Sequence, residues 1–234
     1  MKIGIIILCR TSSIRLPQKA LIKIKNISII DYVIKIAKNV IDNKKIIIST
    51  SLFPEDDILE KIAHQNNIGI FRGDLENVYE RFYQTMEQFD LDHAIRLNGD
   101  SPLNHHSIIE KAIGVFSKNH KADIVTNIFP RTYPKGMSAE IISKILLKSF
   151  RNKIVDKMDF ENVTSFFYKN HNLFQIINFS SQNEYWNKYN LSIDDKFDAT
   201  IIKDIIKKFP DYYNKKTSYK EIIHHYEKIK NFQN

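Results

Sequence analysis

The most constraining feature of the sequence is an unbroken apolar run at its start, Ile3 to Cys9, which ends in a basic turn. An apolar run of this kind is typical of a β-strand that is buried on both faces, as in a parallel sheet. The turn that follows, Arg10 to Lys19, is polar and positively charged. The start of the chain therefore predicts a buried strand that leads into a cationic loop.

Helical and strand patterns then alternate through the first hundred residues. Apolar residues recur at helical spacing in three segments and form short buried runs between them. The predicted helices are 29–40, 55–64 and 77–89, and the predicted strands are 45–50, 67–71 and 94–97. Because strands joined through helices make right-handed crossovers, this order predicts an α/β fold of three layers, α/β/α, around a mostly parallel sheet.

Ligands of such sheets bind beyond the carboxyl ends of the strands. This rule places two loops at the site, residues 10–19 after the first strand and residues 98–102 after the fourth. The second loop reads Asn-Gly-Asp-Ser-Pro, which puts one carboxylate, Asp100, at the end of a strand.

The second half of the chain is less regular. We expect helices at 107–116, 144–150, 160–169 and over most of the segment from 194 to the end, with strands at 123–127, 139–142 and 174–179. No repeat and no low-complexity linker divides the sequence, so one domain over residues 1–234 is the simplest expectation.

Composition and charge exclude several classes of protein. A net charge of +8 is compatible with an anionic substrate, a nucleic acid or a lysine-rich surface. The basic residues near the end of the chain are mixed with acidic and aromatic ones, which indicates a solvated helical face and no nucleic-acid partner. The single cysteine cannot build a disulfide framework, and no apolar stretch is long enough to span a membrane. We therefore expect a cytoplasmic protein with no membrane partner.

The loop after the first strand has the composition of a phosphate site. It holds three cations, Arg10, Arg15 and Lys19, and three hydroxyl groups, those of Thr11, Ser12 and Ser13. Guanidinium groups bind phosphate oxygens in a fork, and lysine supplies a mobile point charge. An ordinary basic surface loop has the same composition, but the position beyond a buried strand favours a triphosphate site.

This loop also carries a resemblance to a known family. The run Leu8 to Leu21 resembles the opening motif A-R-x-x-S-x-R-L-P-x-K-x-L of the cytidylyltransferases that make CMP-Kdo and CMP-sialic acid. The similarity is closer to the SpsF-like branch, the spore coat polysaccharide cytidylyltransferase-like proteins. It extends in order along the chain through Phe71–Gly73 followed by Val78 and Arg81, then Arg96–Leu103, Thr132–Gly136 and Ile193–Asp194.

The resemblance implies a nucleotide-diphospho-sugar transferase fold, similar to glycosyltransferase A. It implies Mg²⁺-dependent transfer of CMP from CTP to an anionic sugar or related small-molecule acceptor, with release of pyrophosphate, in surface polysaccharide biosynthesis. Residues 1–105 would bind the nucleotide. Residues 106–234 would bind the acceptor and form the contact of a homodimer.

The resemblance also assigns roles to single residues. Arg10, Lys19 and Asp100 would be catalytic, and Asp100 and Asp194 would ligate Mg²⁺, which prefers a few carboxylates together with water and phosphate oxygens. The expected nucleotide-binding residues are Cys9, Arg10, Thr11, Ser12, Ser13, Arg15, Lys19, Arg72, Arg96, Asn98 and Gly99. The expected acceptor-binding residues are Tyr133, Gly136, Glu140, Glu161 and Asn162. Arg81 is left open between the site and a helix-surface ion pair, and Asp198 is expected to cap a helix.

Four positions depart from the family pattern. Gln18 stands where glycine is common, which indicates a loop that needs no positive φ there. Lys196 replaces a proline after Asp194. Ser138 and Asn162 replace an acid and a histidine in the acceptor half, so the sequence leaves the acceptor's identity open.

Two other functions stay open at this point. A glycosyltransferase that uses a preformed nucleotide-sugar would need an Asp-x-Asp metal site, whereas residues 98–100 contain one acid. A non-catalytic nucleotide-binding protein would not need both carboxylates, which argues for an enzyme.

Overall fold

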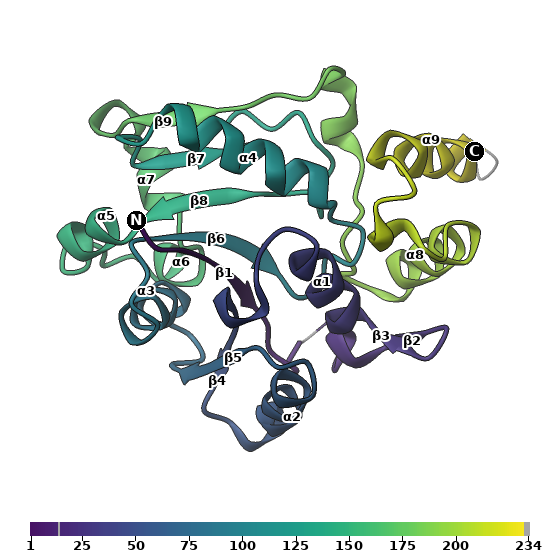
Figure 1. Ribbon diagram of the computed structural model, residues 1–234, viewed down its shortest axis with the longest axis horizontal. Coiled ribbons are helices and arrows are strands. Elements are labelled where there is room, and N and C mark those ends of the chain that lie inside the picture. Colours follow the sequence, from purple (N-terminus) through teal and green to yellow (C-terminus); the bar gives the residue numbers. More distant parts are fainter. Residues whose placement is uncertain (14, 232–234) are drawn as a thin grey trace.

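Figure 1 shows the computed structural model, which describes residues 1–13 and 15–231. The strands are β1 (Ile3–Leu8), β2 (Lys23–Ile24), β3 (Ile27–Ser28), β4 (Ile46–Ser51), β5 (Gly69–Gly73), β6 (His93–Asn98), β7 (Ile124–Thr126), β8 (Glu140–Ser143) and β9 (Ile176–Asn178). The helices are α1 (Ile29–Lys38), α2 (Asp57–Gln65), α3 (Val78–Gln88), α4 (His106–Lys118), α5 (Lys144–Phe150), α6 (Lys157–Glu161), α7 (Ser165–Lys169), α8 (Lys196–Lys208) and α9 (Tyr219–Asn231).

Seven of these strands form one sheet in the order β5-β4-β1-β6-β8-β7-β9. The four strands of the first half, β5, β4, β1 and β6, are all parallel, as their alternation with helices predicted. In the described part of the chain, β8 is the sheet's one reversed strand: it pairs antiparallel with both β6 and β7. The mostly parallel α/β sheet is therefore confirmed.

The apolar strands bury both of their faces, because successive side chains point to opposite sides of a sheet. In β1, Ile5 and Ile7 join the larger apolar cluster with α1, α2 and α4, whereas Ile6 joins the smaller cluster with α3, α5 and α7. Helices thus cover both faces of the sheet in three layers. Figure 1 shows α8 and α9 together at one flank, next to α1.

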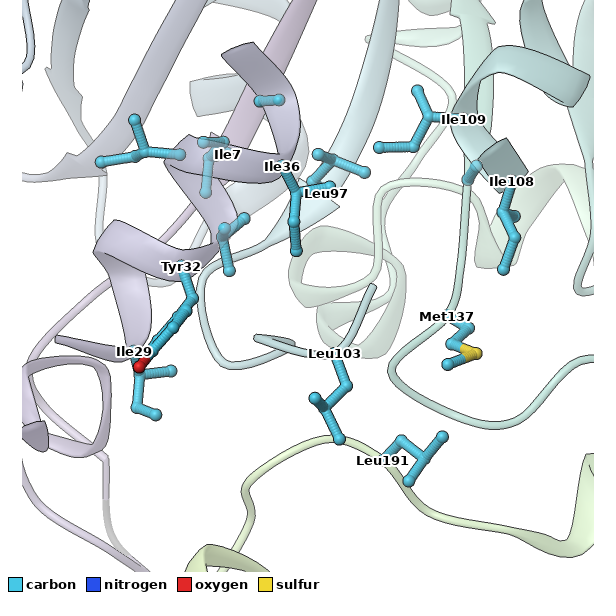
Figure 2. Packing of buried hydrophobic residues seen from close by; sticks show 14 of the residues in the cluster. Ile7, Ile29, Tyr32, Ile36, Leu97, Leu103, Ile108, Ile109, Met137 and Leu191 are labelled. Atoms are coloured by element: carbon cyan, nitrogen blue, oxygen red, sulfur yellow. The ribbon is translucent and has the colours of Figure 1, made fainter. Parts of the chain in front are cut away.

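The larger apolar cluster extends to the base of the two loops that were predicted at the site, residues 10–19 and 98–102. Figure 2 shows Leu103 and Leu191 close together, below the α1 residues Tyr32 and Ile36. Leu103 and Leu191 are fully buried, and the fully buried Tyr212 donates a hydrogen bond to the carbonyl oxygen of Pro102. The turn that follows β6 therefore stands on packed side chains from distant parts of the sequence.

Two sequence predictions of secondary structure were wrong. The predicted helix 160–169 is two short helices, α6 and α7, because Asn162 has extended backbone angles (φ −113°, ψ 94°) and ends α6. The antiparallel ribbon of β2 and β3 was not predicted, since each strand has only two residues. Within the described residues no helix has both the length and the apolar content that a bilayer crossing requires.

Gly136 connects the loop that follows β7 to the segment before α8. The peptide Lys135–Gly136 pairs with this segment, since Lys135 N–H donates to Tyr189 O (2.9 Å) and Leu191 N–H donates to Lys135 O (2.7 Å). Gly136 has φ +91°, and a Cβ atom there would lie 2.5 Å from the backbone of Leu191.

We therefore expect Gly136→Ala to lower the free energy of unfolding by at least about 2 kcal/mol, because both the positive φ and the missing space oppose a methyl group. Urea denaturation measures this change. The matched control is Gly114→Ala in α4, where a Cβ meets nothing within 4 Å. This control should raise the stability by up to about 1 kcal/mol. Equal effects of the two substitutions would contradict the account.

Candidate active site

A cavity of about 590 Å³ opens at the carboxyl ends of β1 and β6, where the two loops were predicted to meet. Its lining holds five cationic side chains, those of Arg10, Arg15, Lys19, Arg81 and Arg96, and three carboxylates, those of Asp100, Glu161 and Asp194. The remaining lining residues are Leu8, Cys9, Ser13, Ala20, Val78, Asn98, Gly99 and Asn162. Residues from both halves of the chain therefore surround one polar space.

The loop after β1 is held in place by a buried carboxylate. Asp56 accepts hydrogen bonds from the backbone N–H and the hydroxyl group of Thr11, both at 2.7 Å, and from the hydroxyl groups of Thr50 and Ser51. Burial alone would raise the pKa of Asp56, but these hydrogen bonds outweigh it and hold the pKa below its ordinary value. Thr11 thus fixes the loop to the start of α2, and its side chain does not line the cavity.

Gln18 corrects an expectation from the sequence. Its backbone is left-handed, with φ 55°, although it is not glycine. Its N–H donates to the carbonyl oxygen of Thr11 at 2.9 Å and so closes the loop. The short 3₁₀ helix Lys19–Leu21 follows at once, and this geometry turns the Lys19 side chain into the cavity.

The ammonium group of Lys19 lies between the two predicted metal ligands. Its Nζ atom is 2.6 Å from Asp100 Oδ2 and 3.6 Å from Asp194 Oδ1, and it donates to the carbonyl oxygen of Ile193 at 2.9 Å. Two carboxylates from loops far apart in the sequence thus converge on one positive charge. Ser101 fixes the orientation of Asp100 by donating to its Oδ1 atom at 3.0 Å.

Asp194 collects three cations. Arg15 Nη2 lies 2.9 Å from its Oδ1 atom, Lys135 forms an ion pair with its Oδ2 atom, and Lys19 is the third cation. Burial acts to raise the pKa of Asp194, but the hydrogen bond from Lys135 and the three positive charges outweigh it and lower the pKa. The carboxylate is therefore ionised and ready to bind a cation at neutral pH.

The neighbouring acids have different partners. Asp195 is the N-cap of α8 and accepts the N–H of Asp198 at 2.9 Å, while Asp198 accepts the N–H of Asp194. The cap of α8 is therefore Asp195, not Asp198 as expected. Asp194 is the acid of this group that lines the cavity.

The structure corrects the expectation for one arginine, Arg72, and decides the position of another, Arg81. Arg72 was expected to contact the nucleotide, but its guanidinium group pairs with Asp57 and Glu60 of α2, outside the cavity lining. Arg81, left open by the sequence, is only 2% exposed and lines the cavity. Burial and the nearby charge of Arg10 lower the pKa of Arg81 to about 10. Its place in the run that the family shares, three residues after Val78, was the signal for this role.

The predicted acceptor residues divide into two groups. Glu161 and Asn162 line the cavity, with Glu161 Oε1 at 3.6 Å from Arg10 Nη2. Tyr133 and Glu140 are fully buried outside the lining, and Gly136 makes the turn described above. Tyr133 packs against Phe179 and Tyr219, so its surroundings are those of a core residue.

Five predicted nucleotide residues remain to be placed. Cys9, Ser13, Asn98 and Gly99 line the cavity, whereas Ser12 is exposed outside its lining. A Cβ atom on Gly99 would lie 2.6 Å from Cys9 Sγ, so a glycine lets the two loops approach each other. Burial, followed by the charge of Asp100, raises the pKa of Cys9, which keeps its thiol protonated.

The sequence comparison decides the family to which this site belongs. Residues 4–233 match the family described as cytidylyltransferase. The chain belongs to the cytidylyltransferase family. The resemblance inferred from the loop motifs is thereby confirmed, and the cavity is the candidate active site of this cytidylyltransferase.

Relatives of known structure and name agree with this assignment. A cytidylyltransferase from Leptospira borgpetersenii has 26% identity and a TM-score of 0.92, with 99% of this chain and 96% of that chain covered. The spore coat polysaccharide biosynthesis protein SpsF of Bacillus subtilis is 27% identical over 211 residues, 87% of this chain and 85% of that protein.

A more distant structure shows the same fold. It is CMP:2-keto-3-deoxy-manno-octonic acid synthetase complexed with CTP, with 14% identity, a TM-score of 0.70 and coverage of 89% of this chain and 100% of that chain. The nucleotide-diphospho-sugar transferase fold that the resemblance implied is confirmed.

The pKa of Asp56 gives a prediction of stability against pH. Because the folded-state pKa lies below the unfolded value of about 4, the contribution of Asp56 is fully present above that pH and is lost as the pH falls through the folded pKa. The variant Asp56→Asn lacks this contribution. We expect the difference in free energy of unfolding between the wild type and Asp56→Asn to shrink between pH 6 and pH 3 in urea titrations. A constant difference would contradict this assignment.

Proposed function

We propose that this cytidylyltransferase transfers CMP from CTP to an acidic sugar or a related anionic acceptor, with release of pyrophosphate, and that Mg²⁺ is required. The observation that carries the proposal is the cluster of Lys19 with Asp100 and Asp194 in a cavity lined by further cations. A triphosphate can replace the carboxylates as the partner of Lys19, and a divalent cation can replace Lys19 as the partner of the carboxylates.

The phosphate groups would bind to the loop after β1. Arg15 and Lys19 form ion pairs with carboxylates here, and an incoming phosphate offers each of them an equivalent anionic partner. Arg10, which is 3.6 Å from Glu161, is the third cation at this edge. Charge-assisted hydrogen bonds of this kind hold a triphosphate in one orientation, and in-line attack at the α-phosphorus requires such an orientation.

The residues fit a magnesium site. Mg²⁺ prefers hard oxygen ligands and is commonly bound by one or two carboxylates together with phosphate oxygens and water. Asp100 and Asp194 supply two carboxylates that already share one cation, Lys19. A bound Mg²⁺ would supply neutralisation of the phosphate charge and polarisation of the phosphoryl group. Lys19, displaced from the carboxylates, would remain close enough to contact the phosphates.

Arg81 supports CTP as the preferred nucleotide. Its Nη1 atom donates to the carbonyl oxygens of Asp74 and Leu75, which fixes the guanidinium plane. Its Nε atom is buried, and no hydrogen-bond partner for it is found among the described residues. The Nη2 atom makes no hydrogen bond with the described residues, so it can donate to N3 of cytosine, which is an acceptor. Uracil has an N–H donor at N3, which opposes such a hydrogen bond.

The reaction needs positioning and charge neutralisation more than covalent help. A hydroxyl oxygen of the acceptor forms a bond to the α-phosphorus and gives up its proton to solvent, while the bond to the pyrophosphate oxygen breaks and pyrophosphate leaves with the electron pair of that bond. Arg15 and Lys19 would hold the leaving group and stabilise the developing charge. Glu161 and Asn162 line the acceptor side of the cavity.

The acceptor class is supported by the relatives. SpsF is named for spore coat polysaccharide biosynthesis, and the synthetase complexed with CTP is named for an acidic sugar. Pyrophosphate release with CTP and Mg²⁺, measured against a panel of ulosonic acids, neutral sugars and phosphonates, tests the proposal. Turnover with an acid supports it, and turnover with UTP as readily as with CTP contradicts it. Homodimerisation, the cytoplasmic location and the division into two functional halves stay predictions.

The two adjacent aspartates offer a matched test of the metal assignment. We expect Asp194→Asn to lower pyrophosphate release by about a hundredfold or more, because it removes one of two metal carboxylates. Asp195→Asn should keep wild-type turnover, since asparagine caps a helix as well as aspartate does. Circular dichroism confirms that both variants are folded. Equal activity of the two variants would show that Asp194 is not a ligand.

Arg81→Lys tests the base-recognition assignment. Lysine keeps the charge but loses the Nη2 donor that the fixed guanidinium plane directs at the base, so the Kd for CTP should rise about tenfold, while the Kd for UTP should change little. Isothermal titration with Mg²⁺ and without acceptor measures both constants. The result that contradicts the assignment is an unchanged ratio of the two constants.

A further inference from the structure

A buried ion pair adjoins the cavity on the side of the sheet that leads to the second half. Arg96 of β6 and Glu140 of β8 are direct cross-strand partners in the antiparallel register. Arg96 Nη2 lies 2.5 Å from Glu140 Oε2, and the Glu140 side chain is fully buried. The Arg96 guanidinium group itself lines the cavity. Arg96 is therefore accessible to a ligand in the cavity, whereas Glu140 is not.

Arg96 has unused hydrogen-bond donors. Its Nη2 atom is engaged by the ion pair with Glu140 Oε2, and its other N–H groups make no hydrogen bond within residues 1–13 and 15–231. None of the Arg96 nitrogen atoms is sealed off from solvent. A guanidinium group in this state can bind an anion in the cavity without losing an existing hydrogen bond.

Glu140 is fixed from the side opposite to Arg96. Its Oε1 atom accepts hydrogen bonds from the hydroxyl groups of Thr164 (3.1 Å) and Tyr168, and the Tyr168 oxygen in turn accepts from the hydroxyl group of Thr126 at 2.9 Å. Burial and the charge of Glu140 raise the pKa of Tyr168 well above its ordinary value, so its hydroxyl group stays protonated as a donor. These contacts hold the carboxylate in place, and the carboxylate in turn holds Arg96 at the cavity wall.

The cations around Glu140 exceed its single negative charge. Burial lowers the pKa of Arg131, and the nearby charge of Arg96 also lowers it, whereas the charge of Glu140 raises it. Arg131 is therefore close enough to interact with the charges of both Glu140 and Arg96. Arg131 donates to Ser138 Oγ at 3.1 Å and does not line the cavity. Of these two arginines, Arg96 is the one that lines the cavity, so it is the one that can bring the excess positive charge into contact with a ligand.

Arg96 lies apart from the proposed phosphate loop, residues 10–19, which carries Arg15 and Lys19. In the sheet, β6 lies between β1, which carries that loop, and β8, which carries Glu140. Arg96 pairs with Glu140 on β8, whereas Arg15 and Lys19 belong to the loop that follows β1. The cavity lining contributed by the second half of the chain includes Glu161 and Asn162. An anion at Arg96 is thus on the acceptor side of Asp100.

We propose that Arg96 binds the carboxylate group of the acceptor. This inference rests on the proposed function and deepens it, because it names the subsite that recognises the acid. It also reassigns Arg96, which the sequence placed among the nucleotide-binding residues. The guanidinium group offers a carboxylate two parallel hydrogen bonds and an opposite charge, which no neutral sugar group can match.

The experiment measures binding of pyruvate and of its neutral analogue pyruvamide by ligand-observed NMR. The protein is held with Mg²⁺ and α,β-methylene-CTP, so that the phosphate loop is occupied. Arg96→Gln should raise the Kd of pyruvate at least about tenfold, which is the loss expected for hydrogen bonds to a charged group. The Kd of pyruvamide should not change.

Two further variants keep the test decisive. Arg72→Gln makes the same change at an arginine outside the cavity and should bind pyruvate as the wild type does. Arg96→Gln/Glu140→Gln removes both buried charges, so it keeps the test valid if the single variant does not fold, and it should also lose pyruvate binding. The inference is overturned if the wild type does not bind pyruvate, or if a folded Arg96 variant binds it equally well. A separate CTP titration distinguishes this failure from failure of the proposed function.

Discussion

The site depends on the contact of the Lys19 ammonium group with the carboxylates of Asp100 and Asp194. These three side chains come from the loop after β1, the turn after β6 and the segment before α8, so the contact joins three separate parts of the fold. Without a cation between them, two carboxylates in a partly buried cavity would repel each other. Lys19 therefore allows the two acids to lie close together. In the proposed function, a divalent cation replaces Lys19 and Arg15 as the partner of the two carboxylates, and the triphosphate becomes the new partner of Lys19 and Arg15.

The sheet order explains how one cavity can serve two substrates. Strand β1 lies inside the sheet between β4 and β6, and the proposed phosphate loop follows it directly. On one side, β6 ends in the carboxylate Asp100. Beyond it, the reversed strand β8 carries Glu140, which pairs with Arg96. In the proposed function, the triphosphate binds the cations that follow β1 and the acceptor binds Arg96 of β6. Leu103 and Leu191 are fully buried close to each other and support the turn that carries Asp100.

The sequence predicted the first half of the fold well because its signals are local. Buried runs such as Ile46–Ser51 and helical spacing in 29–40 are properties of short segments, and the loop positions follow from strand direction. The errors occurred where tertiary contacts decide. Gln18 adopts a left-handed backbone because its N–H closes the loop on Thr11, and Arg72 binds α2 because Asp57 and Glu60 lie beside it in the fold. Glu140 was expected at the acceptor itself, and only the cross-strand register places it behind Arg96. No local pattern distinguishes a carboxylate that contacts substrate from one that holds its neighbour.

The central claim concerns where the divalent cation and the nucleotide bind, and a crystal structure with CTP and Mn²⁺ tests it most directly. The anomalous signal of manganese locates the metal without assumption about its ligands. The account predicts a single strong peak within bonding distance of both Asp100 and Asp194. It also predicts that the phosphates contact Arg15 and Lys19 and that the Lys19 ammonium group has moved off the carboxylates. A manganese peak away from these two residues, or a triphosphate bound outside the cavity, would contradict the account.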